Sequence, residues 1–173
     1  MTIRPATKAD LPAIRAIYAS ARAFMKASGN PTQWGDHYPP EELVAADVDQ
    51  GHSLVVCDEE GPRGVFALIF GPDPTYAVIE GAWPDDRPYA TVHRIASDGK
   101  ERGVLAAAMG HAKTRSASIR MDTHADNTIM QRLLEKQGFR RCGIIHVEDG
   151  TPRLAYQWTR PQANGAGPAR QGA

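Results

Sequence analysis

The sequence is poor in cysteine, in long apolar runs and in net charge, and each shortage argues against a class of protein. Two cysteines among 173 residues are too few for a disulfide framework, and no Cys/His spacing predicts a zinc site. Cys57 and Cys142 both lie in apolar, strand-like stretches. We therefore expect two free thiols, no disulfide and no metal site.

The chain also lacks the features that direct a protein to a membrane or to nucleic acid. No stretch reaches membrane-spanning length, and Met1 to Pro5 lacks the apolar core of a secretion signal. The 20 basic and 20 acidic residues cancel, which disfavours a general electrostatic surface for nucleic acid. The sequence predicts a cytoplasmic protein that binds neither.

The composition that remains is typical of a globular protein. Apolar residues make up 42% and charged residues 23% of the chain, and its length suits one domain with a sizeable core. The segment 161–173 has no periodicity and almost no bulky side chains. We therefore predict one domain over 1–160 and a flexible tail over 161–173.

Apolar periodicity indicates a chain of mixed helices and strands. Helices are predicted between Asp10 and Gly29, from Pro40 to Gly51, over 103–115 and between Asn127 and Gly138. Strands are predicted over 3–6, 52–57, 64–70, 76–83, 89–97, 118–123, 139–147 and 153–158. This order predicts an α/β (α+β) fold.

The stretch from His93 to Leu105 organises the rest. Period-2 alternation predicts a strand over 89–97, and a turn with two glycines and two cations, Lys100 and Arg102, leads directly into a helix. The first amides of a helix have no intrahelical partner and attract anions. This arrangement predicts a phosphate site, although a plain surface turn is an equal alternative from the turn alone.

Two other features are candidates for a binding site. The loop around Trp34, His37 and Tyr38 carries large side chains with polar tips, which suits either a pocket wall or a plug at the edge of the core. Glu80 is a carboxylate within an apolar stretch, and it faces either water or, as the minority interpretation, a cleft.

Several segments resemble the GNAT superfamily of acyl-CoA-dependent N-acetyltransferases. The run Lys100–Leu105 resembles its (Arg/Gln)-x-x-Gly-x-(Gly/Ala) signature, with Lys100 and Leu105 at two imperfect positions. Asn127, a helix and Gly138-Phe139 resemble a second landmark. A closer resemblance is to an uncharacterised bacterial subgroup and is carried by Gln33-Trp34, Tyr38-Pro39, His93–Ser97, Asp122–His124 with Asp126-Asn127, Cys142-Gly143 and Pro152–Tyr156. The resemblance covers about residues 3 to 158.

The resemblance implies a fold and a cofactor. The fold is a mixed sheet of about seven strands flanked by four helices, with one extra strand at 76–83 and a gap where the strand at 89–97 splays from that at 118–123. The cofactor is acetyl-CoA. Ile95 matches the position whose N–H polarises the thioester, the amides of 102–106 would hold the pyrophosphate, and Asn127 would meet the pantetheine. The implied cofactor residues are Ile95, Ala96, Ser97, Lys100, Arg102, Gly103, Val104, Leu105, Ala106 and Asn127.

The implied activity is acetyl transfer to a primary amine of a small molecule or peptide by direct attack. Such an amine must lose a proton, and His93, on the same strand face as Ile95, His124 and Glu80 are the candidate acceptors. Many relatives carry a Tyr as acid for the leaving thiolate where this chain has Leu134, and Tyr156 is the candidate replacement. The predicted acceptor pocket comprises Trp34, His37, Tyr38 and Trp83.

A second interpretation follows from two departures from the family pattern. Leu105 stands where a small residue is expected beside the pyrophosphate, and Leu134 leaves the acid role empty. The alternative is a non-catalytic module on the same scaffold that binds acyl-CoA or a partner. A homodimer stays open at this point.

Overall fold

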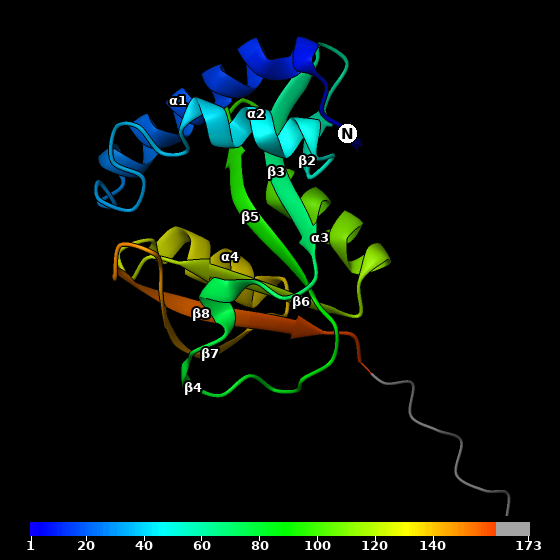
Figure 1. Ribbon diagram of the computed structural model, residues 1–173. Helices are drawn as coiled ribbons and strands as arrows, with labels where there is room; N and C mark the ends of the chain where they lie inside the picture. The colour runs from blue at the N-terminus through cyan, green and yellow to red at the C-terminus, as the bar shows by residue number, and fades with distance from the viewer. Residues whose placement is uncertain (162–173) are drawn as a thin grey trace, which may run out of the picture.

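Eight strands form one mixed sheet, and four α-helices cover its two faces; the computed structural model describes residues 1–161 (Figure 1). The strand order is β1-β2-β3-β5-β6-β8-β7-β4. The strands are β1 (Thr2–Pro5), β2 (Ser53–Cys57), β3 (Pro62–Phe70), β4 (Glu80–Gly81), β5 (Ala90–Ser97), β6 (Ser118–Thr123), β7 (Arg140–His146) and β8 (Pro152–Thr159). The helices are α1 (Leu11–Ala27), α2 (Glu41–Asp49), α3 (Val104–Arg115) and α4 (Thr128–Lys136), and two 3-10 turns are η1 (Lys8–Asp10) and η2 (Pro74–Tyr76).

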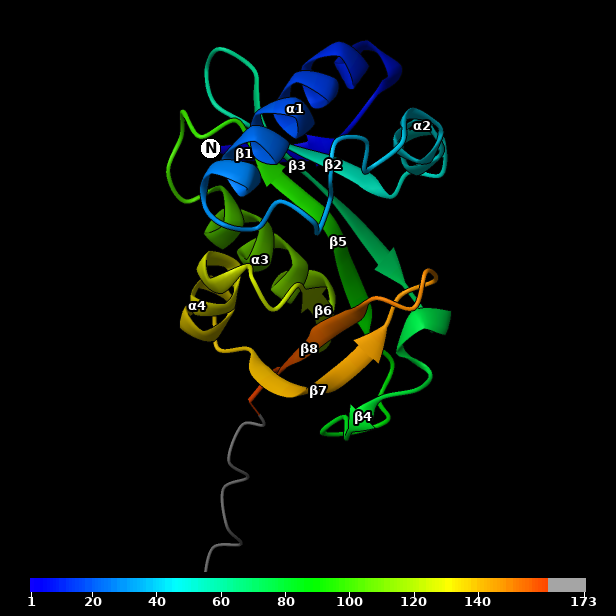
Figure 2. The same ribbon diagram turned by 90° about the vertical axis from the view of Figure 1, so that its left-hand side faces the viewer.

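The helices pack on opposite faces because each buries one apolar side. Helices α1 and α2 cover one face, where Ile14 and Val44 pack in a core with Val55 of β2. Helices α3 and α4 cover the other, where Ala108 and Leu134 pack in a core with sheet residues. Figure 2 shows α3 and α4 together, apart from α2. The predicted mixed sheet flanked by four helices is confirmed within residues 1–161, with eight strands where about seven were predicted.

The two central strands separate soon after they meet. Strands β5 and β6 are parallel and pair only at Ala90 with Ile119 and at Thr91 with Arg120. Beyond Thr91, β5 continues to Ser97 beside β3, while β6 turns away and pairs with β8. The predicted splayed strand pair is therefore present, and it opens the sheet between Val92 and Ser97.

A bulge in β5 changes which side chains share a face. Val65 of β3 lies opposite Ala96 but Ala67 lies opposite His93, so β5 carries one extra residue here. Arg94 has a φ of 53°, a left-handed conformation that is costly for a residue with a Cβ. Ile95 consequently packs with the α3/α4 core, while His93 contacts the ring of Tyr76 on the other face. The prediction that His93 and Ile95 share a face is wrong, because simple alternation does not survive a bulge.

Buried ion pairing holds this bulge. The Arg94 guanidinium donates two hydrogen bonds of 2.8 Å to the Asp47 carboxylate of α2. Both side chains are more than nine-tenths buried. The Tyr18 hydroxyl of α1 donates to the Arg94 carbonyl at 3.0 Å. Both α1 and α2 thus fix the backbone of β5 at the point where the sheet opens.

Residues 76–83 do not form the strand predicted there. Only Glu80 and Gly81 pair with a strand, β7, at the far edge of the sheet. Tyr76 instead ends η2 and is buried. Pro74 and Pro84 flank the segment, and proline cannot donate to a strand ladder. The apolar pattern reflects single side chains that enter the core, not a strand.

Other expectations concern the thiols, the membrane and the tail. Cys57 and Cys142 are free, the first buried and the second partly buried. Within residues 1–161, no helix has both the length and the apolar character needed to cross a membrane. The predicted tail lies, apart from Pro161, outside the described residues.

Candidate active site

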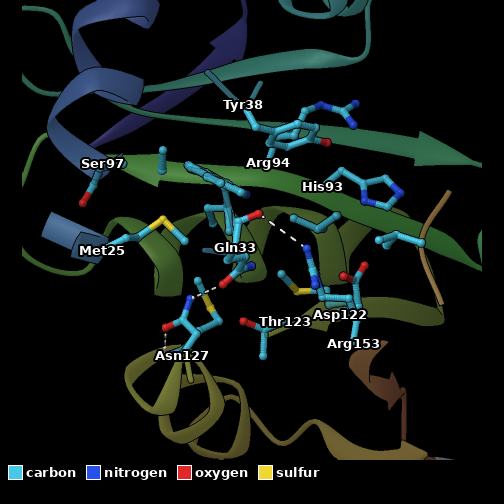
Figure 3. A pocket seen from close by; sticks show the side chains of 18 of the residues that line it. Met25, Gln33, Tyr38, His93, Arg94, Ser97, Asp122, Thr123, Asn127 and Arg153 are labelled. Carbon is cyan, nitrogen blue, oxygen red and sulfur yellow. Dashed lines mark hydrogen bonds between the residues drawn. The ribbon is translucent and has the colours of Figure 1, made fainter. Parts of the chain in front are cut away.

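A cavity of about 1240 Å³ occupies the opening between β5 and β6. Figure 3 looks into it and shows side chains that come from both arms of the sheet and from the loop between α1 and α2. Its walls include the splayed part of β5, the end of β6, the first turns of α3 and α4, and the loop around Trp34. The cavity therefore lies where the resemblance places cofactor and acceptor.

Three neighbouring strands place a titratable or charged side chain on one face at this cavity. Thr91 lies beside Arg120, and side chains two residues apart share a face. His93 of β5 and Asp122 of β6 therefore point to the same side. Asp122 lies opposite Ala155 of β8, which puts Arg153 on that side as well. All three line the cavity.

His93 forms a close pair with Asp73, which precedes η2. Its Nε2 lies 2.7 Å from Asp73 Oδ2, and both side chains are about four-fifths buried. The hydrogen bond to His93 holds the pKa of Asp73 below its usual range. An ionised carboxylate only accepts, so Nε2 carries the proton in the neutral ring and Nδ1 keeps a lone pair. The pair has the arrangement of an oriented general base.

A second carboxylate on this face is bonded to a buried tyrosine. The Tyr76 hydroxyl donates to Asp122 Oδ1 at 2.7 Å. Tyr76 is fully buried, and desolvation raises its pKa well above the usual range. The phenol is therefore a neutral donor that fixes the Asp122 carboxylate at the cavity wall.

Within the described chain, no group of three or more His, Cys, Asp or Glu is arranged to hold a metal ion.

The loop between α1 and α2 crosses the cavity through Gln33. The Gln33 side-chain oxygen accepts from Asn30 at 2.7 Å and from Asn127 at 3.0 Å. The Gln33 carbonyl accepts from Arg153 at 3.4 Å, as Figure 3 shows. One residue of the α1 side thus contacts the start of α4 and the start of β8.

The aromatic side chains of the same loop form part of the wall. Trp34 packs edge-on against Tyr18 of α1, with ring centroids 5.8 Å apart, and lies 6.0 Å from Tyr38. Trp34, His37 and Tyr38 all line the cavity. Trp34 also packs against the α1/α2 core, so the two interpretations of this loop both hold.

The segments predicted to hold the cofactor meet at the opposite end. Ile95, Ala96, Ser97, Val104, Leu105 and Asn127 line the cavity. Lys100, Arg102, Gly103 and Ala106 are not among its lining residues, and all four are exposed in the turn and first helical turn beside it. Gly99 and Gly103 have φ values of 78° and 83°, which favour glycine. Gly103 begins α3 without a side-chain cap.

The side chains of Asn127 and Leu105 make contacts within the protein that the resemblance did not imply. The Asn127 side chain accepts from the Met130 amide at 3.0 Å and donates to Gln33, so both of its polar atoms are already bonded within the protein. Leu105 borders the cavity but also packs against the α3/α4 core. Leucine at this position is thus shared between core and cavity wall.

Four further predicted site residues, the other three candidates for proton transfer and Trp83, do not line the cavity. His124 stays in its turn, where Nδ1 accepts from the Asp126 amide at 3.2 Å. Glu80 is exposed on β4, 3.6 Å from His146. Tyr156 is 1% exposed within the α3/α4 core, and burial raises its pKa. Trp83 packs on the outer side, with the Arg120 guanidinium 4.0 Å from its ring. The positions of these residues in strands and loops did not predict which way their side chains point.

Sequence reasoning missed the roles of Asp73, Asp122 and Arg153 in the cavity. Asp73 lies 20 residues before its partner His93, in a proline-rich turn that no local pattern connects to β5. Asp122 and Arg153 carried a usable signal, since each is a charged residue within a predicted strand of the sheet and such residues are rarely buried without a reason.

Comparison with known proteins finds similar solved structures. No model of a known protein family matches the sequence, and no curated protein matches it. A GNAT-family acetyltransferase from Streptococcus agalactiae is 30% identical over 93% of this chain and 96% of its own, with a TM-score of 0.82. A GNAT-family acetyltransferase from Listeria monocytogenes is 19% identical over 91% and 94%, with a TM-score of 0.68. The Salmonella typhimurium protein yncA, solved with its cofactor acetyl-CoA, is 18% identical over 94% and 95%, with a TM-score of 0.60.

Proposed function

The chain belongs to the GNAT family of acetyltransferases, whose cofactor is acetyl-CoA, and from that premise we propose that it acetylates the primary amine of a small molecule. The observation that carries the proposal is the Asp73–His93 pair, 2.7 Å apart at the wall of the cavity between the splayed strands. A direct attack by an amine requires a nearby group that accepts its proton.

The residues at the other end of the cavity fit acetyl-CoA. The Thr123 hydroxyl is buried, lines the cavity and has no hydrogen-bond partner within the described chain, so a polar ligand atom would complete it. The uncapped first turn of α3, with Lys100 and Arg102 beside it, suits a diphosphate. When bound there, acetyl-CoA supplies the acetyl thioester. Ile95, on the open part of β5, would orient that thioester.

The chain's residues would then manage the proton. His93 Nδ1 accepts a proton from the acceptor amine, while Nε2–H stays hydrogen-bonded to the Asp73 carboxylate. This hydrogen bond keeps the imidazole in one tautomer and stabilises its charged form. The neutral amine nitrogen would then bond to the acetyl carbonyl carbon as the carbon–sulfur bond breaks, and the second proton that the nitrogen loses on forming the amide would pass to the sulfur, so that CoA leaves as its thiol. Of the candidates His93, His124, Glu80 and Tyr156, we assign proton transfer to His93.

The charges of the cavity support an amine as the acceptor. Seven carboxylate side chains and two arginines are among its lining residues, namely Asp36, Asp47, Asp73, Asp98, Asp122, Glu148 and Asp149 against Arg94 and Arg153. A cavity lined mostly by one sign of charge concentrates ligands of the other sign. The aromatic side chains of the loop around Trp34 form part of the cavity wall, which favours a small molecule over a protein chain.

A non-catalytic acyl-CoA-binding module is the second candidate. Leu134 is fully buried, so the acid that many relatives carry at this position has no counterpart there. Tyr156, the expected replacement, is buried as well. The two candidates differ in turnover, since only an enzyme releases free thiol from acetyl-CoA in the presence of an amine.

The experiment measures thiol release with a panel of primary amines for the wild type, His93→Gln and Asp73→Asn. We expect His93→Gln to lower kcat by about 10²–10⁴-fold and to change how kcat/KM depends on pH. The increase in melting temperature on adding CoA should persist. His146→Gln is the matched control, because His146 is half exposed, lies beside Glu80 and is not one of the residues that line the cavity.

Full activity of His93→Gln, with an unchanged pH profile, would contradict the assignment. CoA stabilisation without thiol release from any amine would favour the non-catalytic module.

A further inference from the structure

We propose that the acceptor is a zwitterion, an amine that also carries a carboxylate, and that Arg153 binds this carboxylate. The inference rests on the proposed function and narrows it to one substrate class, amino acids with a free carboxylate. It starts from a charge that the protein itself leaves without a counter-ion.

Arg153 is a buried cation in the cavity wall. It is 9% exposed, at the start of β8. Its guanidinium donates to two main-chain carbonyls, that of Pro152 at 3.2 Å and that of Gln33 at 3.4 Å. Its other N–H groups have no acceptor within residues 1–161, and no carboxylate in that range forms an ion pair with it. These N–H groups are accessible from the cavity that Arg153 lines, so an anion that enters the cavity can form charge-assisted hydrogen bonds with them.

The nearest carboxylates are held by other groups. Asp122 accepts from the Tyr76 hydroxyl. Asp149, in the turn before β8, accepts from the Thr151 amide at 2.8 Å and is exposed, and Arg153 contributes to the lowering of its pKa only as a nearby charge. The Arg153 fork thus remains directed at the cavity in Figure 3, between Gln33 and Asp122.

The neighbouring groups favour a ligand with both charges. Asp122 lies on the same face as Arg153, and its second oxygen has no hydrogen bond within the described chain. A carboxylate paired with Arg153 and an ammonium attracted by Asp122 would satisfy both side chains. A planar guanidinium binds a carboxylate with two parallel hydrogen bonds, which fixes the orientation of the ligand. The amine of such a ligand would lie on the face that carries His93.

This geometry distinguishes a free amino acid from a peptide N-terminus. In a peptide the carbon next to the amine carries an amide, which has no charge to offer Arg153. The proposal therefore predicts that the enzyme discriminates between an amino acid and its α-carboxamide, two molecules of almost the same size and shape.

The test compares thiol release for L-amino acids, their α-carboxamides and their decarboxylated amines. For the preferred side chain, we expect the wild type to show kcat/KM at least about tenfold higher for the acid than for the amide, as one charge-assisted hydrogen bond allows. Arg153→Gln should abolish this preference while it retains activity towards the amide. Arg141→Gln, an exposed arginine on β7, is the matched control and should keep the preference.

A second readout does not depend on turnover. With CoA bound, the amino acid should raise the melting temperature of the wild type more than its amide does, and Arg153→Gln should lose this difference. If Arg153→Gln does not fold, the acid-to-amide ratio of the wild type decides, because a purely structural arginine creates no preference for a carboxylate.

The outcomes separate the two proposals. Equal or better turnover of amides or decarboxylated amines by the wild type would overturn the Arg153 subsite and leave the acetyltransferase standing. A preference for acids that persists in Arg153→Gln would also overturn it. No thiol release from any amine, together with no stabilisation by CoA, would overturn the proposed function and the subsite together.

Discussion

Replacing Asp47 by Asn tests whether a buried ion pair holds the bulge at which the sheet opens. The Asp47 carboxylate is the bidentate partner of Arg94, with both bonds at 2.8 Å and less than a tenth of either side chain exposed. The substitution keeps the shape of the side chain but leaves the guanidinium buried without a counter-charge. Of the contacts that hold Arg94 at a φ of 53°, the hydrogen bond from Tyr18 to its carbonyl would remain, but the ion pair would be lost.

The expected loss of stability is large for one residue. Removing one partner of a buried ion pair costs about 3–5 kcal/mol, and Asn keeps one acceptor oxygen, so we expect about 3 kcal/mol. For a domain of this size that corresponds to a decrease in melting temperature of about 6–12 °C. Ile95 follows directly after the bulge, so we also expect kcat to fall more than KM rises.

Two further variants make the result specific. Asp49→Asn removes an exposed partner of Lys8 on the same helix, where 55% of the Asp49 side chain is accessible, and it should change stability by at most about 1 kcal/mol. Arg94→Gly combined with Asp47→Asn removes the charge and the strained backbone, and it should recover at least half of the loss. The reasoning fails if Asp47→Asn melts within about 2 °C of Asp49→Asn, or if the double variant melts no higher than Asp47→Asn.

Two more predictions concern packing and pH. An added Cβ at Gly64 would lie 2.3 Å from Val104 Cγ1, so Gly64→Ala should lower the free energy of unfolding in urea by about 1–3 kcal/mol; Gly110→Ala, with open space around it, should not lower it. The bonds from Arg4 to Asp10 depress the pKa of that carboxyl, so its stabilisation is present above pH about 4 and is lost as the pH falls through the lowered value. Arg4→Gln should therefore melt about 2–4 °C below the wild type at pH 7, and this difference should become steadily smaller as the pH falls below about 4; a constant difference would contradict this assignment.

The sequence predicted most of the architecture because the signals for it are local. Period-2 alternation located β5, glycines marked the ends of α1, α2 and α4, and the basic turn showed where a helix begins beside the open strand. It failed where one residue changes the register. Arg94 carries no local sign of a left-handed conformation, since Asp47, 47 residues earlier, stabilises it. The shared face of His93 and Ile95 was lost for this reason.

The candidate site was predictable only in part, because its partners are distant in the chain. The sequence could nominate His93 by its titration range, but not Asp73, which orients it across 20 residues. It nominated Trp83 for its size, while the fold uses that ring to cover Arg120. Charged residues inside predicted strands, such as Asp122 and Arg153, were the unused local signal.

The short pairing between β5 and β6 leaves the two halves of the sheet joined by only two residue pairs. Helix α3 packs against β3 and β5 on one side of the opening and against β6 on the other, so its volume influences the distance between the two halves of the sheet. Its Val104 sits against Gly64 of β3, while Ala108 and Met109 fill the core beneath the opening. Changes in the volume of Ala108 and Met109, which do not line the cavity, would widen or narrow the opening, so the size of the acceptor that fits can change during evolution while the residues that line the cavity are retained.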